Sequence, residues 1–230
     1  MQELRIIAEG SKEPSWIKAF NEGADLHGTV ASSVFDTQID KVKEPTERFR
    51  GKSYRDAAKG VNFLLAFGGT EYKLSETLTI SIDMAKDIIN TYFSKTERLK
   101  PFFDRCNDYA VKNKYIRSFK PYSAIRWLLP NVLDAGEIKR RAYNTPIQTT
   151  GACMTKLALV KVRRYIKDNN LQNKVQLIHS VHDAILSKTL IEYAEEWSKI
   201  QENLMIEAGK EFISSIPIVV DTTINTYWQK

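Results

Sequence analysis

Residues 53–69, SYRDAAKGVNFLLAFGG, place the tightest constraint on how this chain can fold. The segment has helical period and ends in two glycines, which readily stop a helix. On a wheel of about 100° per residue, one wide face is apolar and suited to a core. That face consists of Tyr54, Ala57, Ala58, Val61, Leu64 and Leu65. A separate arc of about 120° holds what we term the cation–aromatic stripe: Arg55, Lys59, Phe63 and Phe67.

The cation–aromatic stripe has two interpretations. Two cations one turn apart can bind a triphosphate, Arg55 through its planar fork and Lys59 as a point charge, and an aromatic ring one turn further can meet the base and sugar. Alternatively, Phe63 and Phe67 form an i,i+4 hydrophobic pair against a neighbouring helix, while the two cations are solvated. Spacing alone favours the second interpretation.

Composition sets outer limits on the class of protein. A chain of 230 residues with 43% hydrophobic content can bury the core of one large domain or two lobes. The net charge of +6 and the pI near 9.1 fit a polyanionic partner such as nucleic acid. Two cysteines, Cys106 and Cys153, predict free thiols in a reducing cytoplasm and no zinc site. No apolar run approaches the ~20 residues of a membrane span, so no membrane partner is expected.

Helical signals dominate the first part of the chain. Residues 2–8 are apolar enough for a short buried strand or the entry to a helix, and a loop is expected over 10–15. A charged connection is expected over residues 40–52, and an irregular or extended stretch over 115–130. The helices expected between residues 14 and 112 are 14–23, 25–35, 53–67, 81–93 and a segment from about 101 to 112.

The last third of the chain changes period. Residues 136–167 are mostly helical, with Pro146 suited to the first turn of a long helix. Residues 175–190 predict two short strands joined tightly at His182 and Asp183. A helix over 190–214 and a closing strand over 216–226 follow. These expectations place strands at the two ends of the chain, in a sheet-containing base interrupted by a helical insertion from about residue 14 to 136.

Four positions of the 53–69 helix match a known pattern. Arg55, Lys59, Phe63 and Gly68 reproduce the R-x3-K-x3-F/Y-x3-Y-G motif of the fingers helix in family A DNA polymerases. Four other segments resemble that family in the same chain order, and the likeness spans essentially all 230 residues. They are Glu3-Leu4-Arg5, Asp25-Leu26-His27, Asn144 with Pro146-Ile147-Gln148-Thr149, and Val181-His182-Asp183. Residues 220–228 are also similar to the family's closing strand.

This resemblance implies an α+β fold, in which a palm of antiparallel sheet and helices carries helical fingers and the thumb is absent. The implied division is palm at residues 1–13, fingers at 14–136 and palm at 137–230. The implied activity is template-directed DNA synthesis, a nucleotidyl transfer from dNTPs to a primer 3′ end. The implied partners are a DNA primer-template and dNTPs, and the implied location is the cytoplasm, that of the host if the chain is viral.

The resemblance also implies roles at the nucleotide. Arg55 and Lys59 would hold the triphosphate and act in catalysis, joined by His27, while Phe63 meets the nucleotide. Glu3 would close off the ribose 2′ position and favour deoxynucleotides. Without the resemblance, Glu3 is equally well an ordinary edge charge, and His27 a capping or packing residue.

Further roles are implied at the metal and the DNA. Asp183 would be one of two catalytic aspartates that hold two Mg²⁺ ions, and His182 would contact the primer end; taken alone, both are ordinary turn residues. Gln148 also fits a capping box with Thr145. The residues implied to line the primer-template groove are Phe67, Gly68, Arg140, Asn144 and Gln148.

The chain departs from the family pattern in several places. The other essential aspartate would lie three residues upstream of Met1, which favours the downstream product of a split polymerase gene, such as a bacteriophage carries, over a truncation. An N-terminal polymerase half would then supply the thumb, the first palm strands and that aspartate. Ala184 replaces an acidic residue, Phe67 replaces a tyrosine, and residues 114–130 lack the family's arginine-rich stretch. A non-catalytic DNA-binding or assembly subunit is the competing hypothesis.

Overall fold

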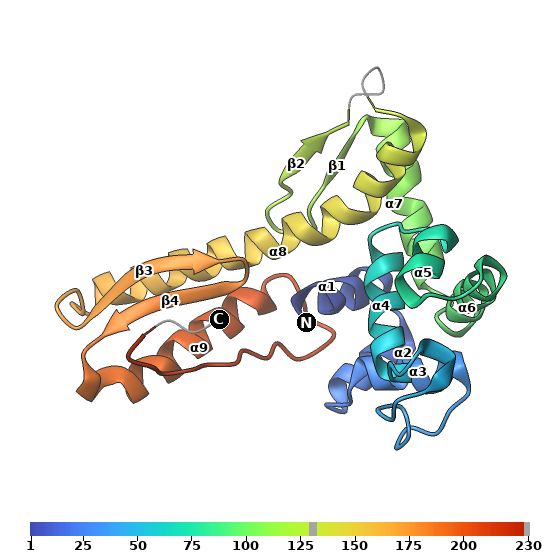
Figure 1. Cartoon of the computed structure of the whole chain (residues 1–230). Helices are drawn as coiled ribbons and strands as arrows, with labels where there is room; N and C mark the ends of the chain where they lie inside the picture. Colours follow the sequence, from blue (N-terminus) through green and yellow to red (C-terminus); the bar gives the residue numbers. More distant parts are fainter. Residues whose placement is uncertain (129–132, 228–230) are drawn as a thin grey trace.

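A computed structural model describes residues 1–128 and 133–227 of the chain (Figure 1). Helices predominate, and the described strands form two antiparallel hairpins, so the predicted α+β class is confirmed. The elements in chain order are α1 Gln2–Ser11, α2 Pro14–Asn21, α3 Leu26–Phe35, the 3₁₀ turn η1 Glu47–Phe49, α4 Tyr54–Ala66, α5 Glu71–Leu78, α6 Ile82–Lys95, α7 Leu99–Asn113, β1 Tyr115–Arg117, β2 Ile125–Trp127, α8 Ala135–Asp168, β3 Val175–Val181, β4 Ala184–Thr189, the 3₁₀ turn η2 Ile191–Tyr193 and α9 Ala194–Lys210.

Helix α8 runs through both parts of the molecule (Figure 1). Its first half contributes Ile147 and Met154 to the main hydrophobic core, which gathers side chains from α1 to α7. Its second half contributes Val162 and Ile166 to a smaller core with β3 and α9. The side chain of Asp134 caps its start by accepting a hydrogen bond from the backbone N–H of Glu137 at 2.8 Å. One helix therefore fixes where the two parts lie.

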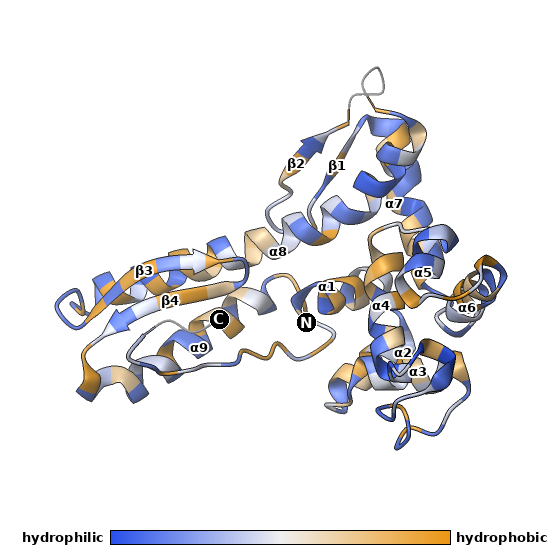
Figure 2. Cartoon of the chain, viewed as in Figure 1, coloured by the Kyte–Doolittle hydropathy of each residue, from blue (hydrophilic) through white to orange (hydrophobic). Residues whose placement is uncertain are grey.

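The N-terminal segment is a helix and not a strand. Leu4, Ile7, Ala8 and Ser11 follow helical spacing and are all buried, so α1 presents one apolar face to the main core (Figure 2). The prediction that strands lie at both ends of the chain is therefore wrong, because its first residues form a helix. Helix α1 lies close to α8 at Gly151, where an added Cβ would come within 3.0 Å of the Gln2 side chain.

The C-terminal part contains the tight hairpin that the sequence predicts. Strands β3 and β4 pair antiparallel, and Val181 pairs with Ala184, so His182 and Asp183 alone form the turn. His182 has a φ of 54°, in the left-handed region that tight hairpin turns require. Helices α8 and α9 pack against each other beside this hairpin (Figure 1).

Two expectations for the C-terminal third are wrong. Pro146 lies inside α8 and not in its first turn, because the buried neighbours Ala142, Tyr143 and Ile147 hold the helix together through packing where proline lacks an N–H. Since no helix starts there, Thr145 and Gln148 do not form a capping box.

The expected strand over residues 216–226 is also wrong, because the described residues offer it no partner strand. Instead Ile216 is buried in the main core and the carbonyl of Pro217 accepts a hydrogen bond from Arg5 Nε at 3.1 Å. Trp228, which ends the family-like segment, lies outside the described residues.

Two elements of the first part were not specified by the sequence. Helix α5 follows α4 after a short turn, although no helix is expected there. Residues 115–127 form the antiparallel hairpin of β1 and β2. Of the two structures expected over 115–130, irregular or extended, these residues therefore adopt the extended one. Residues 129 and 130 lie outside the described residues. Among the described helices, none combines the length and apolar content that a membrane crossing requires.

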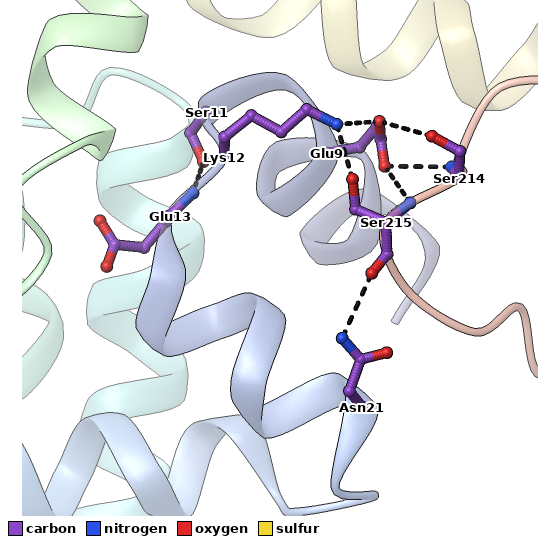
Figure 3. A network of polar contacts seen from close by, with 7 residues as sticks. All are labelled: Glu9, Ser11, Lys12, Glu13, Asn21, Ser214 and Ser215. Carbon is purple, nitrogen blue, oxygen red and sulfur yellow. Dashed lines mark hydrogen bonds and ion pairs between the residues drawn. The ribbon is translucent and has the colours of Figure 1, made fainter.

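Glu9 ties the C-terminal segment to α1 (Figure 3). Its carboxylate accepts hydrogen bonds from the backbone N–H groups of Ser214 at 3.1 Å and Ser215 at 2.9 Å. Lys12 pairs with the same carboxylate and donates to the Ser215 hydroxyl at 2.7 Å. Asn21 Nδ2 donates to the Ser215 carbonyl at 3.2 Å. Two segments some 200 residues apart in sequence thus share one small polar network.

The network sets the ionisation of Glu9. Burial raises the pKa of its carboxyl, but the hydrogen bonds from Lys12 and from the two backbone amides outweigh burial and hold the pKa below the ordinary value of 4.5. A carboxyl with a lowered folded-state pKa stabilises the fold above its unfolded pKa, and this contribution is lost as pH falls through the folded value.

Substituting Glu9→Gln should lower the free energy of unfolding at pH 7 by about 1–3 kcal/mol, because a charged acceptor of two amide hydrogen bonds is lost. The deficit should shrink as pH falls below about 4.5. Urea unfolding followed by circular dichroism at several pH values measures both effects. Glu22→Gln is the matched control, since Glu22 is 59% exposed and lies 3.9 Å from Lys18. Equal losses in the two variants would contradict this role of Glu9.

Candidate functional site

Helix α4 presents the two faces that its sequence predicts. Its start is capped by Ser53, whose hydroxyl accepts from the backbone N–H of Asp56 at 3.1 Å and donates to the Asp56 carboxylate at 2.7 Å. Ala57, Ala58, Val61 and Leu65 are buried, while Tyr54 and Leu64 at the edge of that face are half-buried. The helix packs on α3 and α5. The predicted core face is confirmed.

The cation–aromatic stripe lies on the other side of α4. Lys59 is exposed and the Arg55 side chain is 33% exposed, so both cations can reach solvent. The rings of Phe63 and Phe67 are half-buried and stack with centroids 6.2 Å apart. This geometry contains both the surface that could bind a nucleotide and the i,i+4 aromatic pair of the structural interpretation.

Arg55 is held by the carboxylate of Asp25, the residue that precedes α3. Arg55 Nε donates to Asp25 Oδ2, and Nη2 donates to Oδ1 at 3.2 Å, which makes a two-pronged pair. The hydrogen bond that Arg55 donates to the Asp25 carboxylate raises the pKa of Arg55. Burial raises the pKa of Asp25, but the bond from Arg55 outweighs it and the net pKa is lowered. The guanidinium is therefore charged and oriented before any ligand binds.

His27 lies beneath the stripe and is only 3% exposed. Its ring contacts Phe63, with centroids 5.9 Å apart, and its Nδ1 lies 3.0 Å from Nδ2 of the buried Asn62. Burial lowers the pKa of His27, and the nearby cations Arg55 and Lys59 lower it further against the opposing effect of Asp25. Contact between this ring and a ligand requires neighbouring side chains to move.

The C-terminal end of α4 meets α8 at a glycine. Gly68 has a φ of 71°, and an added Cβ would lie 3.3 Å from Tyr143 and 3.5 Å from the Cα of Arg140. Asn144 Nδ2 donates to the carbonyl of Phe67 at 3.5 Å. The sequence suggested that Phe67, Gly68, Arg140 and Asn144 line one surface. The structure brings these four residues together: Phe67 and Gly68 follow α4, and Arg140 and Asn144 lie on α8.

The other sequence-predicted site residues lie on elements other than α4. Gln148 is exposed on α8, His182 and Asp183 are exposed at the tip of the β3–β4 hairpin, and Glu3 is half-buried on α1. In the described part of the chain, no hydrogen bond or ion pair links these side chains to the stripe.

Asp183 does not form a metal centre with its neighbours. Across residues 1–128 and 133–227, no three or more His, Cys, Asp or Glu side chains gather where they could hold a metal ion. A single exposed carboxylate does not fit the donor set that two Mg²⁺ ions need.

Sequence reasoning missed two residues of this site. Asp25 was noted only as part of a triplet, and a charge just before a helix gives no sign that it faces Arg55. Asn62 lies one turn beyond Ala58 on the wheel, at the edge of the core face, and it is fully buried. A lone amide on the core side of a helix was the signal that could have identified it.

Comparisons with known proteins show the family of this chain. The sequence model of DNA polymerase family A matches residues 1–230. DNA polymerase I of Caldicellulosiruptor bescii is 30% identical over 98% of this chain and 25% of that protein. DNA polymerase I of Aquifex aeolicus is 32% identical over 99% of the chain and 38% of that protein. The chain therefore spans well under half the length of these relatives.

A solved polymerase structure has a similar fold. The POL domain of Pol1 from M. smegmatis, in complex with DNA primer-template and dNTP, superposes with a TM-score of 0.79 at 29% identity, covering 94% of this chain and 36% of that one. The fold is therefore that of a polymerase domain. The chain belongs to DNA polymerase family A.

Because the Ser53 cap fixes the start of α4, Ser53→Ala should lower the free energy of unfolding by about 1 kcal/mol. Thr70→Ala is the matched control, since Thr70 stands at the same position before α5 but makes no side-chain capping bond. Chemical denaturation of both variants measures the difference. If Thr70→Ala lowers the free energy of unfolding as much as Ser53→Ala does, the capping hydrogen bond of Ser53 does not stabilise α4.

Proposed function

We propose that this chain carries out template-directed DNA synthesis, as the C-terminal fingers and palm part of a family A DNA polymerase. The observation that carries the proposal is the α4 surface: two solvent-accessible cations followed by two rings, on a helix whose other face is buried. Membership of the family supports it. The proposed division is palm at residues 1–13, fingers at 14–136 and palm at 137–230, and the proposed location is the cytoplasm.

The proposed nucleotide is a deoxynucleoside triphosphate. Arg55 and Lys59 bind its phosphates and neutralise the charge that develops as pyrophosphate leaves. Asp25 keeps the Arg55 guanidinium in place, which reduces the ordering that binding would otherwise require. Phe63 contacts the base and sugar, and Glu3 excludes a ribose 2′ hydroxyl.

The proposed primer-template groove follows the junction of α4 and α8. Gly68 lets Arg140 and Asn144 approach the end of the stripe, so a base pair that contains the incoming nucleotide would meet both helices. Gln148 extends the same side of α8, and uncharged amides there can contact the minor groove without reading sequence. His182, at the hairpin tip, contacts the primer end.

Asp183 is the proposed catalytic carboxylate of this chain. Magnesium would supply the charge that activates the primer oxygen and steadies the phosphate, but Asp183 alone does not complete its donor set. We therefore assign the second carboxylate, together with the thumb, to polymerase residues outside this sequence, as in the split enzyme that the resemblance predicts.

A non-catalytic DNA-binding subunit is the second candidate function. Ala184, which replaces an acidic residue, and the absence of a metal cluster among the described residues favour it. The paired Arg55 and the exposed Lys59 argue against it, because DNA binding alone has no need of a triphosphate-shaped surface.

Lys59→Ala should lower the rate of single-nucleotide incorporation by roughly 10²-fold or more, because a positive charge at the departing pyrophosphate is lost. The assay is primer extension by the polymerase assembled from this chain and a segment that carries the second carboxylate. Lys86→Ala is the control, since Lys86 is also exposed but lies on α6. Incorporation by Lys59→Ala at the wild-type rate would refute the triphosphate assignment.

Asp183→Ala should abolish turnover in the same assay while primer-template affinity stays within about twofold, because the change removes one exposed carboxylate from a turn and leaves the basic surfaces intact. Fluorescence anisotropy of labelled DNA measures the affinity. Asp87→Ala, an exposed aspartate on α6, is the matched control. If the polymerase assembled with Asp183→Ala keeps full activity, Asp183 is not a catalytic residue, and the hypothesis of a non-catalytic subunit is favoured.

A further inference from the structure

His27 and Asn62 form a buried polar pair between α3 and α4. His27 is 3% exposed and Asn62 is fully buried. The amide nitrogen of Asn62 lies 3.0 Å from Nδ1 of His27, which is hydrogen-bond distance. The other amide atom, Asn62 Oδ1, is buried without a hydrogen-bond partner in the described structure.

Packing and stability do not explain the amide. A buried acceptor left without a partner opposes folding, and an apolar side chain of similar size would fill the same space without that oxygen. What an apolar side chain could not do is act on the imidazole. Among the described residues, the Asn62 side chain makes one hydrogen bond, and it goes to a ring nitrogen.

An amide nitrogen can only donate a hydrogen bond, so the ring nitrogen that faces it must be the unprotonated acceptor. A neutral imidazole with a bare Nδ1 carries its proton on Nε2. We propose that Asn62 is a positioning residue that fixes His27 as the neutral Nε2–H tautomer, a hydrogen-bond donor for a triphosphate oxygen. This inference rests on the proposed nucleotide site.

The charges around His27 fit the same assignment. The groups that act on the ring are Asp25 beside α3, Arg55 and Lys59 on α4 and the amino group of Met1 before α1. Three of the four are cations and, together with burial, they lower the pKa of His27. An imidazolium would also point a protonated Nδ1 at the Asn62 NH₂, so that two donors would face each other. The site therefore gains a directed donor without a further charge.

The test reads the tautomer directly by long-range ¹H–¹⁵N NMR on the full ¹⁵N-labelled chain without nucleotide. The chain has three histidines, and the variant His27→Gln identifies the signals of His27. The wild-type ring should be protonated at Nε2 and bare at Nδ1. Asn62→Asp replaces the donor with a carboxylate of the same shape. It should move the proton to Nδ1 and raise the pKa of His27 by about 1–3 pH units.

Asn113→Asp is the matched control, because it makes the same change of charge on α7, where the Asn113 amide bonds to the Tyr109 carbonyl. It should leave the His27 signals unchanged. Asn62→Ala is a second variant, for use if the buried carboxylate of Asn62→Asp prevents folding. Without the amide donor, His27 in Asn62→Ala should be a mixture of the two neutral tautomers. A wild-type ring protonated at Nδ1, or the same tautomer and pKa in Asn62→Asp or Asn62→Ala as in wild type, would overturn the proposal.

Kinetics separate this inference from the proposed function. In the assembled polymerase, Asn62→Asp should raise KM for the dNTP and shift its pH dependence, while Asn113→Asp should match wild type. If the wild type shows the Nε2–H tautomer but incorporates no nucleotide, the proposed function fails and the role of Asn62 in setting the tautomer stands. If incorporation is normal and the tautomer is wrong, only the inference about Asn62 fails.

Discussion

Helix α8 packs in both hydrophobic cores and so holds the fingers-like helices and the β3–β4 hairpin in one molecule. Its first half belongs to the main core and its second half to the smaller core beside the β3–β4 hairpin. One continuous helix therefore joins the part of the molecule that holds the α4 surface to the part that holds Asp183. Pro146 removes one backbone donor from this helix, and burial of the residues around it maintains the helix.

The α4 site combines a rigid support with a charged surface. The buried face holds the helix against α3 and α5, so the stripe keeps its orientation without help from a ligand. Asp25 restrains Arg55, whereas Lys59 is free to move in solvent. The buried pair of His27 and Asn62 lies underneath and departs from the rule that buried polar atoms are satisfied. Such departures concentrate at functional sites, where local stability is given up for chemistry.

Local patterns predicted much of this structure. The two faces of α4 and the turn at His182 and Asp183 could be read from the sequence because helical period, glycine stops and strand alternation act over a few residues. The course of α8 through Pro146 could not be read in this way, nor could the lack of a described partner strand for residues 216–226, because both depend on residues distant in sequence. The contact of Asn62 with His27 was hidden for the same reason, since it joins residues 35 positions apart.

The proposed roles of α4 and its neighbours all depend on the binding of a nucleoside triphosphate to the cation–aromatic stripe. The most direct measurement is an experimental structure of the assembled polymerase with primer-template and dNTP. Phosphate oxygens should lie within hydrogen-bond distance of Arg55 and Lys59, and Phe63 should contact the sugar and base. A dNTP bound at another surface, with the stripe still open to solvent, would contradict these proposed roles.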